Sequence, residues 1–202
     1  MNVEGTRRLL DAATLADVPR ILITSSMSAA PEVPSTYGAA KRSIESIAAE
    51  RGAMVVRPGL VWDDAGDRGL VAGMRAAVRR LPIIPVPRVE VANQVLVHAR
   101  DLAAVILRAV EDTIPADRPL PIAHPEALRL EEIARRIARR DGRRVRIIRL
   151  PSAVAIAGLR LAEFSRVPLP FRADNILGVI HAPTPTVGGG APLGVPLRPF
   201  AG

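Results

Sequence analysis

The chain has 202 residues, of which 49% are hydrophobic and 24% are charged, and its formal net charge is +8 at pH 7. This composition is typical of globular proteins of one or two domains and excludes the disordered and collagen-like classes. No apolar run reaches the roughly 18 residues of a membrane span, and we expect no export leader. The absence of cysteine and the three scattered histidines argue against disulfides and a metal site. These features predict a cytoplasmic protein without metal ligands.

Helix and strand patterns alternate in the first third of the chain. Residues 2–16 carry apolar side chains at helical spacing, and residues 20–24 form a short aliphatic run that leads into the polar loop 25–28. Helical spacing returns over residues 37–51, and a second aliphatic run occupies residues 53–57. This alternation predicts an α/β fold with a parallel sheet.

The remaining elements are expected in a looser order. They are a helix at 70–80, a strand at 95–97, a helix at 101–111, a short strand at 122–123, a helix at 128–140 and a strand at 145–150. The tail from Pro168 is rich in proline and glycine, so we expect it to be loosely ordered.

One tyrosine and one lysine stand out by their scarcity. Lys41 is the single lysine beside 27 arginines, and Tyr37, the single tyrosine, lies four residues before it. On a helix the two side chains face the same way, so the ammonium group could lower the pKa of the phenol toward neutral. Such a pair suits acid/base chemistry at an alcohol or carbonyl oxygen. The structural alternative is an ordinary helix start with an inward aromatic ring and a surface lysine.

Hydroxyl groups follow the first predicted strand. Ser25, Ser26 and Ser28 lie just past its carboxyl end, where parallel sheets collect their ligands. Any of the three could hydrogen-bond the same substrate oxygen as Tyr37. Pro58 and Gly59 force a turn at the end of the second strand.

This arrangement of strand, serine loop, Tyr-x-x-x-Lys helix, strand and Arg57-Pro58-Gly59 resembles the short-chain dehydrogenase/reductase superfamily. The opening residues 2–10 are similar to a helix of its extended branch, the NAD-dependent epimerase/dehydratase family, and residues 98–103 to a later segment. The resemblance implies part of a Rossmann-like sheet in residues 1–112, the C-terminal part of such a domain. It leaves a small substrate-side region in residues 113–202.

The resemblance also implies site residues and partners. Tyr37 would be the general acid/base, Lys41 would hold the nicotinamide ribose of NAD or NADP, and Ser26 would orient the reacting oxygen, although Ser25 and Ser28 stay open as alternatives. Pro58 and Gly59 would lie against the nicotinamide, and Asn2 would support the polar network. The reaction would be hydride transfer at a carbinol or carbonyl carbon of a small-molecule substrate, as in oxidoreductases, epimerases and dehydratases.

Several features depart from the family pattern. The chain has no glycine-rich strand-to-helix turn for the pyrophosphate, and Gly66, Gly69 and Gly73 have the wrong spacing for one. Leu60 replaces an asparagine common in nucleotide-sugar enzymes. We therefore expect a truncated chain, and a catalytically silent remnant is an alternative function. A truncated sheet would leave residues 21–23 as an exposed edge, which predicts a homo-oligomer or self-association.

Arginines crowd the stretch 135–149, which suggests a nucleic-acid binder as a further alternative. Ile133, Ala134, Ile137 and Ala138 give this helix an inward face, however, and no aromatic residue lies between the arginines. A solvated helix face explains the pattern, and we expect no nucleic-acid partner.

Overall fold

The computed structural model describes residues 3–64, 69–112, 118–165, 173–182 and 192–202. Asn2 and Gly66 lie outside these residues. No helix within the described ranges is long and apolar enough to cross a membrane.

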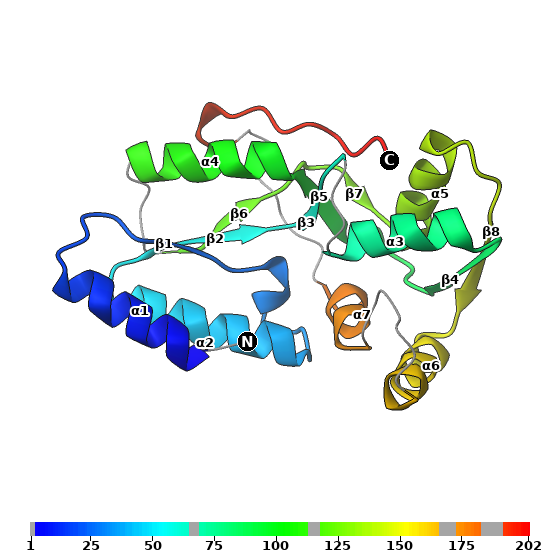
Figure 1. The fold of residues 1–202 in the computed structure, drawn as a ribbon, viewed down its shortest axis with the longest axis horizontal. Coiled ribbons are helices and arrows are strands. Elements are labelled where there is room, and N and C mark those ends of the chain that lie inside the picture. The colour runs from blue at the N-terminus through cyan, green and yellow to red at the C-terminus, as the bar shows by residue number, and fades with distance from the viewer. Residues whose placement is uncertain (1–2, 65–68, 113–117, 166–172, 183–191) are drawn as a thin grey trace.

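A parallel sheet forms one half of the molecule (Figure 1). Its strands are β1 (Leu22–Thr24), β2 (Met54–Pro58) and β6 (Leu120–Ile122), in the order β1-β2-β6. Leu22 is paired with Met54, and Val56 with Leu120. The parallel α/β fold predicted from the sequence is therefore confirmed.

Helices cover both faces of this sheet (Figure 1). Helices α1 (Val3–Leu15) and α2 (Thr36–Ala49) lie on one side, and α4 (Ala99–Asp112) lies on the other. Neighbouring residues of a strand point to opposite faces. Accordingly, Val55 packs with the α1 and α2 residues, whereas Val56 packs with the α4 residues, and both are buried.

The strands continue past Gly59 into a second group. Strand β3 (Leu60–Trp62) runs parallel to β5 (Gln94–His98), which pairs antiparallel with β7 (Ala127–Leu128). A side chain at Gly59 would not fit, because its Cβ would lie 2.3 Å from the Val95 carbonyl oxygen. The turn thus depends on glycine for close approach of two strands.

The other half of the molecule holds the largest core cluster, in which Ile133, Ile137 and Phe200 are almost fully buried. Its elements are α3 (Gly69–Arg80), β4 (Ile83–Pro87), α5 (Leu130–Arg140), β8 (Arg146–Leu150), α6 (Ser152–Phe164) and α7 (Ala173–Ile180). Strand β4 pairs with β8 in parallel. The sequence patterns did not predict β4, β7, α6 or α7.

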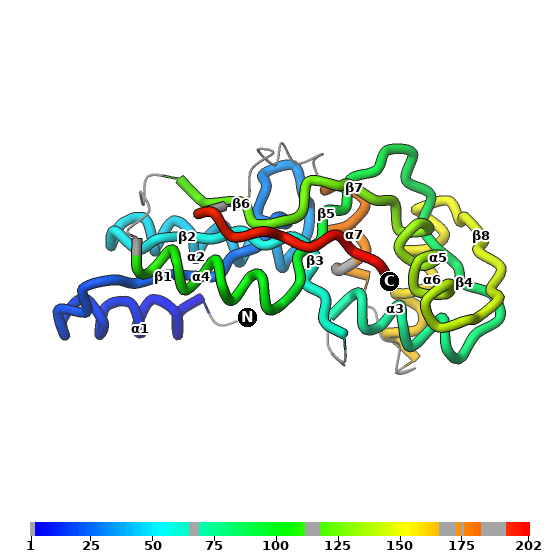
Figure 2. Tube along the Cα trace, turned by 90° about the horizontal axis from the view of Figure 1, so that it is seen from above, coloured from blue at the N-terminus to red at the C-terminus, as the bar shows by residue number. Residues whose placement is uncertain are grey.

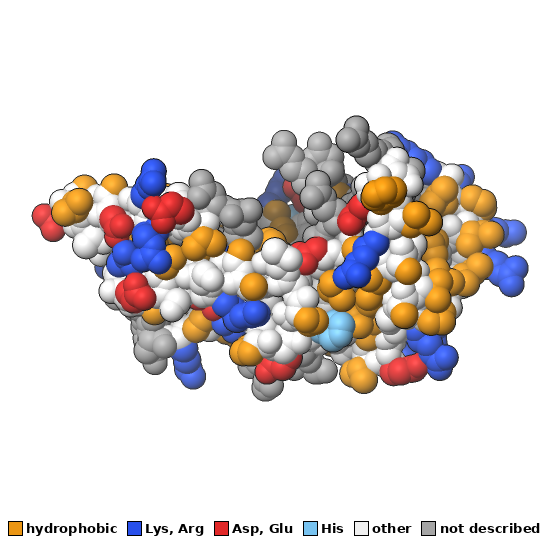
Figure 3. All heavy atoms as spheres, turned by 90° about the horizontal axis from the view of Figure 1, so that it is seen from below, with side chains coloured by type: hydrophobic (Ala, Val, Ile, Leu, Met, Phe, Trp, Pro, Cys, Tyr) orange, Lys and Arg blue, Asp and Glu red, His pale blue; other side chains and the backbone are white. Residues whose placement is uncertain are grey.

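Helix α6 is unusual because it is apolar and has no buried residue. Val154 is 54% exposed, Leu161 67% and Phe164 88%. The face of the molecule shown in Figure 3 carries many hydrophobic side chains in its right-hand part, on the side where Figure 1 places α6. This half therefore exposes more apolar surface than a filled core requires.

The last residues lie along both halves, in contrast to the loose tail that their composition predicts. From the 3-10 helix η2 (Pro192–Gly194), the tail passes α4 and ends near α5 (Figure 2). The Phe200 ring packs edge-on against Trp62 at 5.1 Å, and Arg198 pairs with Asp101 at 2.7 Å. Composition could not reveal these contacts, because they join residues about 100 positions apart or more.

Candidate active site

The serine loop lies directly at the carboxyl end of β1. The Ser25 amide donates to the Val56 carbonyl at 2.7 Å, which keeps the loop on the sheet. Ser26 begins the 3-10 helix η1 (Met27–Ala29), and its hydroxyl accepts a hydrogen bond from the Ser28 amide at 3.2 Å. The loop is therefore held by hydrogen bonds of its backbone amides and lies just beyond the strand.

Two side chains fix the start of helix α2. Ser35 is the N-cap residue, and its hydroxyl accepts from the Gly38 amide at 2.9 Å. Asp174, from α7, accepts from the amides of Thr36 at 2.8 Å and Tyr37 at 3.1 Å. A carboxylate at a helix N-terminus satisfies free amides and interacts favourably with the helix dipole.

Sequence reasoning missed Asp174, because the tail beyond Pro168 was expected to be loose. A weak signal exists: this acidic residue opens the short apolar stretch that ends at Ile180, which is the pattern of a helix start.

Gly38 allows the helix to approach the serine loop. A Cβ at this position would lie 2.1 Å from the Ser28 carbonyl oxygen and 2.9 Å from the Ser35 hydroxyl oxygen. Only glycine therefore permits this separation between the start of α2 and the loop that carries Ser26.

Tyr37 and Lys41 share one face of α2, as their spacing predicts. The Lys41 ammonium nitrogen lies 5.8 Å from the centre of the Tyr37 ring and donates to the Thr24 carbonyl at 2.7 Å. Of the three candidate serines, Ser26 is the one whose side chain affects the pKa of Tyr37, which it lowers.

The electrostatics differ from the sequence-based expectation. Burial raises the pKa of Tyr37 above its ordinary value, and the hydrogen bond with Ser26 only partly opposes this shift. Burial also lowers the pKa of Lys41, against the opposing charge of Glu45. The predicted lowering of the Tyr37 pKa by Lys41 is thus wrong for this structure, because desolvation of the phenolate dominates the shift and Lys41 is not among its causes.

The predicted site residues line one cavity of about 370 Å³. It is lined by five of the residues predicted for the site and by the two alternative serines: Ser26, Tyr37, Lys41, Pro58, Gly59, Ser25 and Ser28. Asp174, Gly178 and Val179 of α7 form another part of the wall. The site thus combines both halves of the molecule.

The cavity also contains an unsatisfied polar group. The Ser25 hydroxyl is buried and has no hydrogen-bond partner among the described residues. A buried hydroxyl without a partner is costly, so it favours a polar ligand at this place.

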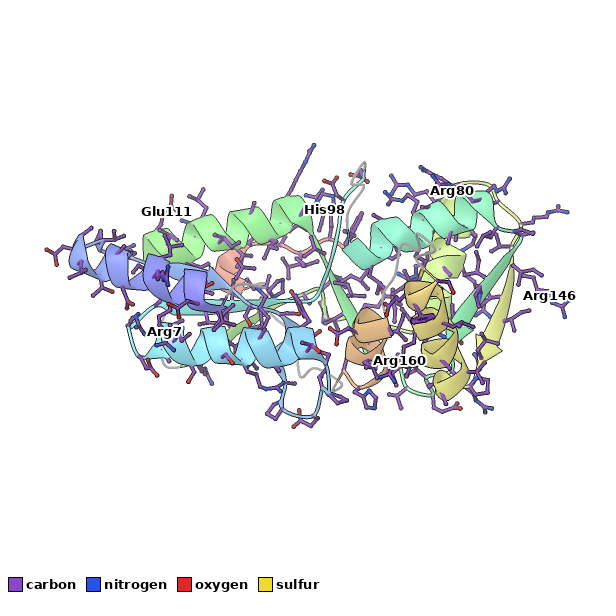
Figure 4. All side chains as sticks on the ribbon, turned by 60° about the horizontal axis from the view of Figure 1, so that its bottom comes forward. Arg7, Arg80, His98, Glu111, Arg146 and Arg160 are labelled. Atoms are coloured by element: carbon purple, nitrogen blue, oxygen red, sulfur yellow. The ribbon has the colours of Figure 1, made fainter. Side chains whose placement is uncertain are left out.

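Among the described residues, no group of three His, Cys, Asp or Glu side chains could hold a metal ion. His98 begins no such cluster: it is 1% exposed and packs edge-on against Trp62 at 4.5 Å. Figure 4 places it in the middle of the molecule, where α4 begins. We interpret His98 as a core residue.

The arginines of α5 and its exit surround a separate open hollow of about 890 Å³. Its two glutamates are already paired, Glu126 with Arg136 and Glu132 with Arg129. Arg80 and Arg146 lie at the same end of the molecule, away from α1 and α2 (Figure 4). None of the described residues that line the hollow is aromatic, so they offer no stacking platform for bases.

The parallel sheet, its helices on both faces and the site at the strand ends define a Rossmann-like α/β protein. No family model and no curated protein match the chain. Solved structures do match, and among them are an NAD-dependent dehydratase, an NADPH-dependent oxidoreductase, a reductase in complex with NADP and a UDP-N-acetylglucosamine 4-epimerase.

Three of these neighbours illustrate the similarity. An NADPH-dependent quinone oxidoreductase from Escherichia coli, complexed with NADPH, has a TM-score of 0.72 at 19% identity, over 96% of this chain and 67% of that one. A dTDP-4-dehydrorhamnose reductase from Bacillus anthracis, in complex with NADP, has a TM-score of 0.63 at 17% identity, over 89% and 70%.

The third is an NAD-dependent NDP-hexosamine 5,6-dehydratase involved in tunicamycin biosynthesis, with a TM-score of 0.60 at 16% identity. The alignment covers 74% of this chain but only 56% of the dehydratase, so the chain spans little more than half its length. At these identities the comparisons establish the fold.

Proposed function

We propose that this chain carries the catalytic part of an NAD(P)-dependent oxidoreductase that transfers hydride at a carbinol or carbonyl carbon. The observation that carries the proposal is the convergence of Ser26, Tyr37 and Lys41 on one cavity at the carboxyl ends of parallel strands. The nicotinamide-dependent activities of the structural neighbours support the same reaction class.

Each of the three side chains has a chemical task. Tyr37 moves a proton between its phenol oxygen and the substrate oxygen, as a general acid/base. Ser26, which lines the same cavity and lowers the pKa of Tyr37, orients that substrate oxygen. Lys41 uses one of its three N–H donors on Thr24, which leaves two for a ribose.

The cavity fits the nicotinamide end of the cofactor. Lys41 would hold the nicotinamide ribose, Pro58 and Gly59 would contact the ring, and the unpartnered Ser25 hydroxyl offers a polar contact. When bound, the nicotinamide ring supplies the hydride or accepts it. The raised pKa of Tyr37 favours the phenol form, which is ready to donate a proton during carbonyl reduction.

Nucleotide binding to the 202-residue chain tests this proposal. We expect nicotinamide mononucleotide and NAD to bind with affinities within about threefold of each other, because this sequence has no glycine-rich turn for the pyrophosphate. Both should shift the NMR signals of Tyr37 and Gly59, whereas AMP should not. Lys41→Ala should weaken both interactions about tenfold or more.

Arg139→Ala serves as the control, because Arg139 lines the separate arginine hollow. This variant should leave the shifts at Tyr37 unchanged. If AMP shifts Tyr37 as strongly as NAD does, the proposed orientation is wrong. If none of the three nucleotides acts on Tyr37, the catalytically silent alternative is favoured.

The sheet edge supports a proposal about assembly. Among the described strands β1 pairs only with β2, its residues Leu22 and Ile23 are half-buried, and Thr24 is exposed. We propose that a second copy adds to this edge. Light scattering should then show a concentration-dependent dimer, and Ile23→Lys should abolish it. A monomer in which the β1 and β2 amides are equally protected from hydrogen exchange would contradict the proposal.

A further inference from the structure

A second cavity, of about 280 Å³, lies next to the candidate active site. It is enclosed by residues of α3, β4, α5, β8, α6 and α7. The described residues that line it are all apolar, with Met74, Ile84, Leu150 and Leu159 among them. These described residues therefore offer an occupant no side-chain hydrogen bond and no charge.

The two cavities adjoin each other. Leu70, at the start of α3, lines both of them. Helix α7 also contributes to both, since Ile176 lines the apolar cavity and Val179 the candidate active site. A ligand at Tyr37 could thus extend past Leu70 into apolar surroundings.

Apolar side chains at the rim of this cavity are exposed to solvent. Val154 and Leu81 line it although they are 54% and 46% exposed. Helix α6, whose residues Val154, Ala155, Gly158 and Leu159 line the cavity, has no buried residue. Exposed apolar surface around a concave site is typical of a binding site for an apolar group.

We propose that this cavity binds the hydrocarbon part of the substrate whose hydroxyl or carbonyl group reacts beside Tyr37. The inference rests on the proposed function and specifies its substrate as an aliphatic alcohol or ketone. A sugar or diphosphate does not suit the cavity, because it would lose its hydration without gaining hydrogen bonds. The volume holds a chain on the order of nine carbons, at about 30 Å³ per small group.

A homologous series of 2-alkanones, from hexan-2-one to undecan-2-one, tests the inference on the 202-residue chain. Calorimetry should show affinity rising about twofold to fourfold per added methylene group until the cavity is full. NMR should show that decan-2-one shifts the signals of both Ile176 and Tyr37. UDP-glucose should not compete with it.

Gly158→Phe is designed to fill the cavity. Gly158 lines it, and a Cβ there would meet no atom within 4 Å, so a larger side chain can be added at the cavity without a clash. We expect decan-2-one to bind at least about tenfold more weakly. Leu161→Phe is the matched control, because Leu161 lies on the same helix, is 67% exposed and does not line the cavity.

Leu159→Ala provides an independent test should Gly158→Phe fail to fold. It enlarges the cavity, so the chain length at which affinity levels off should increase. Affinity independent of chain length, or equal binding to wild type and a folded Gly158→Phe variant, would overturn the inference. Shifts at Ile176 without any at Tyr37 would also overturn it, because the bound ketone would then not reach the reacting group.

The two proposals can fail separately. Alkanone binding needs no cofactor. If nicotinamide mononucleotide shifts Tyr37 but the alkanones do not bind, only the substrate inference fails. If the alkanones bind but no nucleotide shifts Tyr37, the cavity is a hydrophobic binding site and the proposed reaction is refuted.

Discussion

Replacing Tyr37 with phenylalanine is expected to lower turnover by about 10² to 10⁴-fold, because no other residue in the cavity offers a phenol to carry the proton. The ring would keep its place beside Lys41, so nicotinamide binding should change less than about twofold. Steady-state kinetics with NAD(P) and a medium-chain secondary alcohol or its ketone, together with nucleotide titrations, would measure both effects.

Two further variants accompany this experiment: Lys41→Ala changes a second site residue, and Ser43→Ala is the control. Lys41→Ala should reduce both turnover and cofactor affinity, since the lysine would hold the ribose. Ser43 lies exposed on the same helix and outside the cavity, so Ser43→Ala should behave like the wild type. Unchanged turnover in Tyr37→Phe would refute the assignment of Tyr37 as acid/base.

Gly38→Ala is expected to destabilise the fold by about 3 kcal/mol, because the added methyl group would collide with the backbone at Ser28. The helix would have to move away from the serine loop and would separate Tyr37 from Ser26. A misplacement of this kind lowers turnover on the order of 10²-fold. Urea unfolding and kinetics on the same variant would measure the two losses.

Gly158→Ala is the matched control for this substitution, since it also places alanine in a helix but meets no atom within 4 Å. It should be neutral or stabilise the protein by up to about 1 kcal/mol. Equal unfolding midpoints for the two alanine variants would show that close approach at Gly38 is unimportant.

The sequence by itself predicted features that depend on local spacing. The four-residue interval between Tyr37 and Lys41 requires a shared helix face, and the short aliphatic run before Ser25 requires a strand that ends at the serines. For the same reason, the inward face of α5 was predicted correctly: Ile133 and Ile137 recur at helical spacing and are buried. These properties follow from the periods of helices and strands, which neighbouring residues already contain.

Only the tertiary structure decided the features that join distant residues. Asp174 caps the helix of Tyr37 from 137 residues away, and Gly38 is needed because a loop ten residues earlier returns to it. The pKa of Tyr37 likewise depends on burial in the folded chain, so its net shift is opposite to the one expected from the spacing of Tyr37 and Lys41. The apolar cavity beside the site arises where six elements meet, and no single segment encodes it. Contacts of this kind depend on how the chain closes on itself, whereas spacing describes only one element at a time.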